Sequence, residues 1–285
     1  MIVSTDTLPG VIDTKNAPFI DVDMPNEAYH AEKHHISRST AHRYADDDMG
    51  GRSQRYAEQG GSLFGGNSST GFGTIVDVAC GAEMRGVDWR SQVAVPPDNV
   101  LASDGSRRGK AYQEWKATLP AGFCECNATD YAKVQDIIAS IYEHDAAKAL
   151  VEAATHSQYS VFWTDSDGHA RKARADGVTP RGWFDLKTTS SEWRDLKWSF
   201  LRFGYDWQAV WYADAARVAG FEPFDFPFIV VQTFAPFNVK VVTLPGDVLA
   251  RAADEIKRTL DAVRTRRETG IYVPASYHAV QELVF

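Results

Sequence analysis

The stretch from Gln158 to Thr189 constrains the fold more than any other part of this chain. Between Tyr159 and Thr164, aromatic or β-branched residues alternate with small or polar ones, and residues 165–169 have the composition of a turn. An extended, basic segment follows and ends at Asp176, so the pattern predicts a β-hairpin. After a loop punctuated by glycine and proline, Gly182 to Lys187 is predicted to form a third short strand.

The third strand is predicted to place a carboxylate and an ammonium group together. Successive side chains of a strand point to opposite faces, so Trp183, Asp185 and Lys187 share one face, opposite Phe184. Asp176 supplies a second carboxylate at the end of the hairpin. Mg²⁺ prefers oxygen ligands and retains several waters, so this set fits a site that holds the cation beside an attacking water. A lone D-x-K on a strand is usually only a solvated ion pair, so further residues must favour the metal site.

A helix predicted at about Glu192 to Ala219 contains those further residues. Its segment GYDWQAVWY places Gln208 and Tyr212 four positions apart, and therefore on one helical face. Together with SVFW and FDLKTT, this motif resembles the PD-(D/E)XK core of the RecE-type exodeoxyribonucleases, also called exonuclease VIII. Further segments are similar to that family in the same order: ISRSTAHRY at 36–44, RRGKAYQEW at 107–115 and VVQTFAPFNV at 230–239.

The resemblance implies a fold and a set of metal ligands. The fold is α/β (α+β), a restriction-endonuclease-like PD-(D/E)XK core in which helices flank a central mixed sheet. Asp176 and Asp185 would bind Mg²⁺, for which Mn²⁺ can substitute, and the carbonyl of Leu186 would be a further ligand. Lys187 would orient and activate the attacking water.

The resemblance also implies roles for the helix and an activity for the whole protein. Gln208 and Tyr212 would support the site or contact the DNA backbone, with the satisfaction of buried polar groups as the alternative. The implied activity is 5′-to-3′ exonucleolytic hydrolysis of linear double-stranded DNA in phage-type recombination. The implied partners are DNA ends, a single-strand annealing protein and further copies of the chain in a ring. An endonuclease on the same fold is an alternative.

Two positions depart from the pattern of the family that the chain resembles. Asp77, in a helix predicted at 72–81, stands where that family carries a histidine, and Gln158 stands where it carries a glutamate. Because a carboxylate suits Mg²⁺ or Mn²⁺ better than imidazole does, the changes would be compensatory, with Asp77 as a third metal-binding carboxylate. Two alternatives stay open. Asp77 lies on the helix surface, or the chain is a catalytically impaired DNA-binding protein on the nuclease fold.

Charge and cysteine content narrow the function further. The net charge is −8, but eight basic and four acidic residues lie between His169 and Arg202, a local balance of +4. Lysine and arginine contact phosphates, so we expect a DNA-binding surface around the site, with a merely solvated face as the alternative. The three cysteines, Cys80, Cys124 and Cys126, are too few for the four-cysteine iron–sulfur cluster of a Cas4-like nuclease. Reduced, partly buried thiols are expected.

The whole chain, residues 1–285, is predicted to form a single nuclease domain. Residues 1 to about 35 lack sustained periodicity and are expected to form a loose lead-in, and the glycine-rich stretch at about 46–72 is expected to be a flexible loop. Further predicted elements are a helix capped by Ser37, a helical tract at 130–154 interrupted near 143–145, a β-hairpin around Pro236 and a long amphipathic helix at 246–270.

The expected location follows from two negative observations. No apolar run approaches the roughly 18 residues that a membrane-spanning helix requires. The amino-terminal residues also lack the basic-then-apolar pattern of a secretory signal. The protein is therefore expected in the cytoplasm, with no membrane partner. The resemblance implies a bacterial host and a phage or prophage gene.

Overall fold

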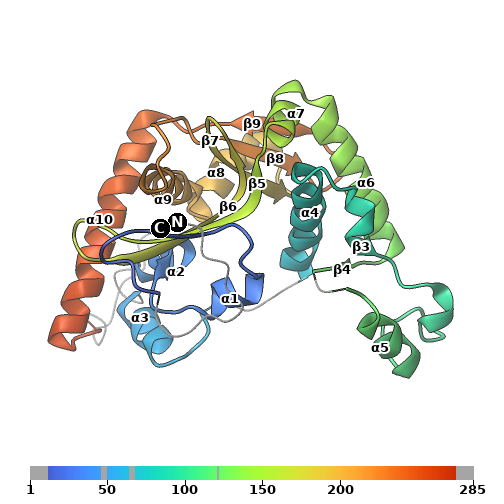
Figure 1. Cartoon of the computed structure of the whole chain (residues 1–285), viewed down its shortest axis with the longest axis horizontal. Helices are drawn as coiled ribbons and strands as arrows, with labels where there is room; N and C mark the ends of the chain where they lie inside the picture. Colours follow the sequence, from blue (N-terminus) through green and yellow to red (C-terminus); the bar gives the residue numbers. More distant parts are fainter. Residues whose placement is uncertain (1–11, 46–49, 64–67, 121, 274–285) are drawn as a thin grey trace.

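A computed structural model describes residues 12–45, 50–63, 68–120 and 122–273, which fold around one mixed β-sheet (Figure 1). Within these residues the sheet has seven strands, in the order β1-β5-β6-β7-β8-β9, with β2 paired to β6. The β7–β8 and β2–β6 pairs are parallel and the others antiparallel, which confirms the predicted mixed sheet. The strands are β1 Phe19–Asp21, β2 Ile36–Ser37, β5 His156–Thr164, β6 Ala170–Thr179, β7 Gly182–Thr189, β8 Phe228–Gln232 and β9 Val239–Val242.

The predicted hairpin and third strand are present as β5, β6 and β7. The boundary at Asp176 was wrong, because β6 continues through Val178, which pairs with Trp183 of β7. The strand extends because Ala175 and Val178 are buried on the sheet and Gly177 pairs with Phe184. The second predicted hairpin is also confirmed, as β8 and β9, with Pro236 in the connection.

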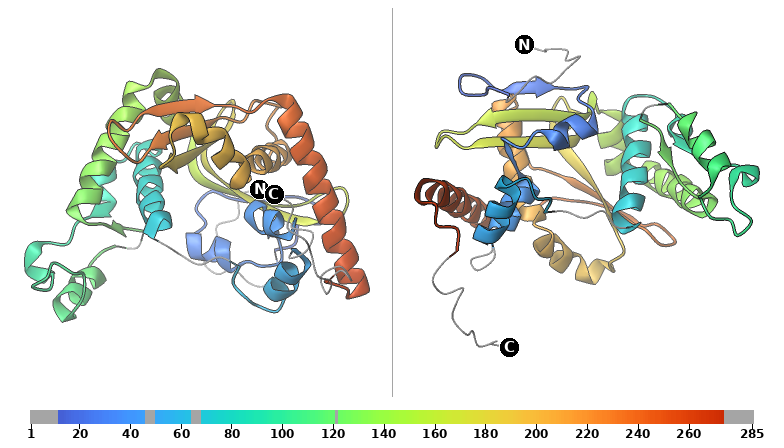
Figure 2. Two further views of the ribbon diagram at one scale, coloured as in Figure 1. Left: turned by 180° about the vertical axis from the view of Figure 1, so that it is seen from behind. Right: turned by 90° about the horizontal axis from the view of Figure 1, so that it is seen from below.

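Helices cover both faces of the sheet (Figures 1 and 2), and the two faces of β7 enter different cores. Trp183 belongs to a core formed with α2, α9 and α10. Phe184 and Leu186 belong to a second core formed with α4, α6 and α7. The sheet is thus the middle of three layers, as the alternation in β7 predicts. The helices are α2 Arg38–Tyr44, α4 Ser68–Met84, α6 Ala128–Glu143, α7 Asp145–Glu152, α9 Tyr205–Val218 and α10 Gly246–Thr269.

Several helix predictions are confirmed at the level of single residues. The side chain of Ser37 caps α2 by accepting a hydrogen bond from the Thr40 backbone N–H. The helical tract breaks at His144, which separates α6 from α7 and caps the second of them. α10 ends at Gly270, whose φ of 70° lies in the left-handed region that favours glycine.

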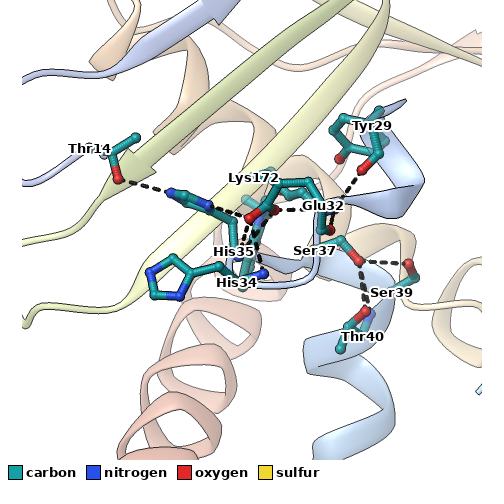
Figure 3. Close-up of polar contacts among 10 residues, drawn as sticks. Thr14, Tyr29, Glu32, His34, His35, Ser37, Ser39, Thr40 and Lys172 are labelled. Atoms are coloured by element: carbon teal, nitrogen blue, oxygen red, sulfur yellow. Dashed lines mark hydrogen bonds and ion pairs between the residues drawn. The ribbon is translucent and has the colours of Figure 1, made fainter. Parts of the chain in front are cut away.

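The segment expected to be a loose lead-in is instead ordered over the residues that the structure describes. It forms β1 and the helix α1 Asn26–Ala31, which pack on β5 through Tyr29 and Phe162. The reason lies in β6, whose Lys172 is buried and needs partners. Its ammonium donates to the Tyr29 carbonyl at 2.7 Å and lies 3.6 Å from a carboxylate oxygen of Glu32 (Figure 3). Sequence periodicity could not show this, because tertiary contacts hold the segment: the Lys172–Glu32 ion pair, hydrogen bonds from Lys172 and Arg174, and the packing of Tyr29 on Phe162.

The flexible loop expected at about 46–72 is also wrong where the structure describes it. Residues 50–58 form the helix α3 Gly50–Glu58, and α4 begins at Ser68. Two of the glycines permit close packing. A side chain at Gly50 would lie 2.3 Å from the Tyr44 carbonyl oxygen, and one at Gly51 would lie 1.7 Å from that of Tyr272. Residues 46–49 and 64–67 lie outside the described part, as does most of the carboxy-terminal tail.

The single helix predicted at about 192–219 is two helices, α8 Leu196–Arg202 and α9, preceded by a short 3-10 turn at Trp193–Asp195. Gly204 separates the helices with a φ of 64°, a conformation that residues with side chains rarely adopt. The break lets α8 leave the axis of α9.

The remaining elements form an appendage beyond α4 (Figure 1). They are α5 Lys110–Ala117, the paired strands β3 Val93–Ala94 and β4 Cys124–Glu125, and 3-10 turns at Trp89–Ser91 and Asp98–Val100. Cys80, Cys124 and Cys126 are free thiols, two of them buried. Among the described residues, no helix is both long and apolar enough to span a membrane.

Candidate active site

The candidate site lies where β6 and β7 separate. Backbone pairing between the two strands ends with Gly177 and Phe184. Beyond that point the carboxylate of Asp176 takes the place of the missing backbone partner, because its Oδ2 accepts a hydrogen bond from the Leu186 N–H at 2.9 Å. Gly177 is required at the last pair, since a Cβ there would lie 2.1 Å from the ring of Phe184. The separation of the strands opens a gap into which side chains can point.

Asp185 is the residue to which most of the site connects. It is buried, and its Oδ1 accepts a 2.5 Å hydrogen bond from Nε2 of Gln208. Its Oδ2 forms an ion pair with the ammonium of Lys187. Asp185 and Lys187 therefore project to the same side of β7 and touch, as the alternation of the strand predicts.

Asp77 approaches the same gap from α4. Gly73, one helical turn earlier on the same face, is so close to β7 that a Cβ there would lie 3.4 Å from the hydroxyl of Thr188. Burial raises the pKa of Asp77 to about 7, against the lowering effect of the Lys187 ammonium and with a further contribution from the Asp185 carboxylate. Asp77 is half-buried, and the effects of Asp185 and Lys187 on its pKa place its carboxylate in their neighbourhood.

The three aspartates crowd negative charge around one lysine. Burial raises the pKa of Asp176 well above its usual range, and the Asp185 and Asp77 carboxylates raise it further. Burial alone would lower the pKa of Lys187, but the Asp185 and Asp176 carboxylates outweigh it and raise that pKa. The Lys187 ammonium also lies 5.2 Å from the centre of the Tyr205 ring. It therefore stays charged and is the cation that offsets the carboxylates.

The donor set suits a small hard cation. Among the described residues, no group of three or more histidine, cysteine, aspartate or glutamate side chains is already gathered as a metal-binding cluster. Mg²⁺ does not need one, because it usually takes one or two protein carboxylates and completes its shell with waters and phosphate oxygens. Asp176 and Asp185 can supply the two protein carboxylates. The Leu186 carbonyl faces the same side as its N–H, which binds Asp176.

Tyr212 and Gln158 differ in how they relate to the gap. Tyr212 packs its ring edge-on against Trp183 and Phe226, with centroids 6.4 and 5.7 Å away. Burial raises the pKa of its phenol, and the Asp185 and Asp176 carboxylates add to this effect. Gln158 lies directly across from Asp176, and its Nε2 is 3.5 Å from Oδ1 of that residue. Its φ of 56° is a left-handed conformation, which is uncommon outside glycine and often found at functional sites.

The basic surface expected between His169 and Arg202 is smaller than the sequence indicates. Arg171, Lys172 and Arg174 are all buried. Arg171 donates to Asp214 at 3.0 Å, and Arg174 donates to the Met24 carbonyl at 2.8 Å. These cations stabilise the interior and are not available to phosphates. The exposed basic residues of this range are Arg181, in the turn between β6 and β7, and three residues on and before α8, Arg194, Lys197 and Arg202.

Arg38 is a site residue that the sequence did not single out. From α2, its Nη2 donates to Oε1 of Gln208 at 3.2 Å, and its Nη1 donates to the Phe203 carbonyl at 2.8 Å. The amide of Gln208 is thereby held between Arg38 and Asp185. The segment ISRSTAHRY was recognised as a motif, but nothing in its local pattern shows which helix it contacts.

We expect Arg38→Ala to lower kcat about ten-fold, because losing a charged hydrogen bond of about 1.5 kcal/mol releases the Gln208 amide. The measurement is a double-mutant cycle, in which kcat on linear DNA is compared for Arg38→Ala, Gln208→Ala and the double variant. Residues that act through one another give a double variant no slower than the worse single variant. Additive losses, or a change in KM alone, would show instead that Arg38 contacts DNA independently.

We expect the metal-free protein to lose stability as pH rises from about 4 to about 7. The folded state holds the Asp77 proton up to about pH 7, whereas the unfolded chain releases it near the ordinary value of 3.8. Asp77→Asn should therefore raise the Tm at pH 8 in EDTA and leave it unchanged near pH 4. It should also raise the Mg²⁺ concentration that half-maximal activity requires.

The matched control for Asp77→Asn is Asp254→Asn, which neutralises an exposed aspartate on α10. Both measurements are thermal unfolding followed by circular dichroism, and both activity titrations use one linear duplex. Equal melting curves for wild type and Asp77→Asn at pH 8, together with an unchanged Mg²⁺ titration, would show that Asp77 is not part of the site.

Comparisons with known proteins agree with this geometry. A family model described as "PDDEXK-like domain of unknown function (DUF3799)" matches residues 110–272, more than half of the chain. A solved structure from Eubacterium rectale named a "Putative exonuclease" is similar with a TM-score of 0.61 and 13% identity, covering 92% of this chain and 96% of that one. At this identity the likeness concerns the fold alone. No curated protein matches the chain.

Proposed function

Because the chain belongs to the family of PDDEXK-like domains of unknown function (DUF3799), we propose that it is a Mg²⁺-dependent deoxyribonuclease acting on linear double-stranded DNA. The observation that carries the proposal is the contact of Asp185 with both Lys187 and Gln208 at the point where β6 and β7 separate. A solvated ion pair would not bury its carboxylate at 2% exposure or share it with a buried glutamine.

Four residues of the site would hold the metal ion used in phosphodiester hydrolysis. Mg²⁺, for which Mn²⁺ can substitute, would supply a Lewis acid and a water of lowered pKa. Asp176 and Asp185 would hold it, with the Leu186 carbonyl and Asp77 as further ligands. The N–H of Leu186 fixes the carboxylate of Asp176.

Lys187 and Gln208 act around these carboxylates. Gln208 fixes the orientation of Asp185 through its amide. Lys187 carries a charge in reach of Asp185, so it can orient the attacking water and stabilise charge that develops on the phosphate.

The resemblance to RecE-type exonucleases supports a finer proposal. The enzyme would start at a DNA end, digest 5′ to 3′ and thread the duplex through a ring-shaped homo-oligomer. It would act in phage-type recombination in the bacterial cytoplasm, beside a single-strand annealing protein.

We expect covalently closed circular DNA to survive under conditions that degrade the same plasmid once it has been linearised. An enzyme that needs an end has no place to begin on a closed circle. Agarose gels of both forms, incubated with Mg²⁺, check this expectation. Nicking of the supercoiled plasmid at the rate of linear digestion would indicate an endonuclease. Binding of the duplex with no digestion of either form would indicate the impaired DNA-binding alternative.

A further inference from the structure

The outward face of α8 carries apolar side chains where a surface helix ordinarily carries polar ones. Trp198 is 61% exposed and Leu201 is 41% exposed, while Phe200, on the opposite side, is buried. Trp198 and Leu201 are three residues apart and therefore share a face. Phe203, directly after the helix, is 52% exposed. Figure 2 shows this gold helix at the outer edge of the molecule.

Basic side chains accompany these apolar ones. The Lys197 ammonium lies 4.8 Å from the centre of the Trp198 ring, and the Arg202 guanidinium lies 5.8 Å from that of Phe203. Exposed aromatic rings that alternate with cations fit nucleic acid without its complementary strand, because bases stack on the rings and phosphates bind the cations.

The surface is continuous with the candidate active site. The ring of Phe203 lies 5.9 Å from that of Tyr205, and Tyr205 lies under the ammonium of Lys187. The Phe203 carbonyl also accepts the hydrogen bond from Arg38. A strand that reaches Lys187 would therefore pass these rings.

We propose that the outward face of α8, with Phe203, binds unpaired nucleobases at the end of the DNA strand that enters the active site. This inference rests on the proposed function and names the form in which the substrate is held, a single-stranded end. A second protein copy fits less well. Each aromatic side chain offers roughly 150–250 Å² when fully covered, so three half-exposed side chains fall short of the about 800 Å² per partner of a stable interface.

The test measures binding of a short single-stranded oligonucleotide, labelled with fluorescein at its 3′ end, by anisotropy in EDTA, where no hydrolysis occurs. The double variant Trp198→Ala/Phe203→Ala should bind about five-fold to a hundred-fold more weakly for each ring that stacks. Trp198→Leu/Phe203→Leu should be weakened as well, because leucine keeps the apolar surface but has no π face. Tyr56→Ala, which removes a 56% exposed ring on α3, is the control and should bind as the wild type does.

Two results would overturn the inference. Unchanged affinity of the alanine double variant would exclude stacking on α8. A double variant that changes from oligomer to monomer by light scattering, with unchanged oligonucleotide affinity, would make the face a contact between copies of the chain. Because binding is measured without metal, a wild type that binds through α8 but never hydrolyses DNA would contradict only the proposed function.

Discussion

Lys187→Ala is expected to slow the digestion of linear DNA by about 10²- to 10⁴-fold, the usual contribution of a positioned acid or base. Lys187 is the cation that the Asp185 and Asp176 carboxylates hold in its charged form. Its removal takes away the group that orients water and leaves the buried Asp185 without its ion-pair partner. The measurement is release of acid-soluble nucleotide from an end-labelled duplex with Mg²⁺.

The control for Lys187→Ala is Lys240→Ala. Lys240 is also a strand lysine above an aromatic ring, 4.8 Å from the centre of Trp193, but it lies on β9. Its removal should leave the rate unchanged. Circular dichroism establishes that both variants are folded at the assay temperature. Digestion by Lys187→Ala at the wild-type rate would mean that the active-site assignment is wrong.

Asp185→Asn is expected to reduce turnover by about a thousand-fold, because a metal site contributes several kcal/mol to charge stabilisation. Asparagine keeps the shape but not the charge, so Lys187 loses its partner and the metal loses a ligand. The nitrogen of the new amide can also face the Gln208 donor. Isothermal titration with Mg²⁺ should show weaker binding than in the wild type, and the rate should not recover at saturating Mg²⁺.

Asp214→Asn separates this effect from a general loss of stability. Asp214 also pairs with a buried cation, Arg171, at 3.0 Å, but lies away from the gap between β6 and β7. Breaking that pair should lower the Tm and leave the rate per folded molecule unchanged. If Asp185→Asn also lowered only the Tm and left the rate per folded molecule unchanged, Asp185 would be a structural residue.

The sequence was most informative where the pattern is local. The hairpin, the shared face of Asp185 and Lys187, and the breaks at His144 and Gly270 follow from side-chain periodicity and capping, which act over a few residues. The prediction for Asp77 required that its side of the helix face the sheet. In α4, Gly73 lies one turn earlier on the same face and is close to Thr188 of β7. The assignment of Gln208 required a motif, because its contact with Asp185 spans 23 residues.

The features that escaped prediction depend on tertiary partners. The order of residues 12–35 comes from buried cations on β6, and no pattern within that segment shows that Lys172 will need Glu32. Glycines 50 and 51 indicated flexibility but permit close contacts with Tyr44 and Tyr272. Arg38 bridges elements 165 and 170 residues away in the chain, so only the folded structure joins it to the site.

The central claim is that the wild-type chain hydrolyses linear duplex DNA by using a divalent cation. The most direct test follows soluble product released from an end-labelled linear duplex across a Mg²⁺ titration, with EDTA as the zero point. The account predicts no release in EDTA, release that saturates with Mg²⁺ and recovery of activity when Mn²⁺ replaces Mg²⁺. Folded protein that binds the duplex but releases no product at any Mg²⁺ or Mn²⁺ concentration would contradict it.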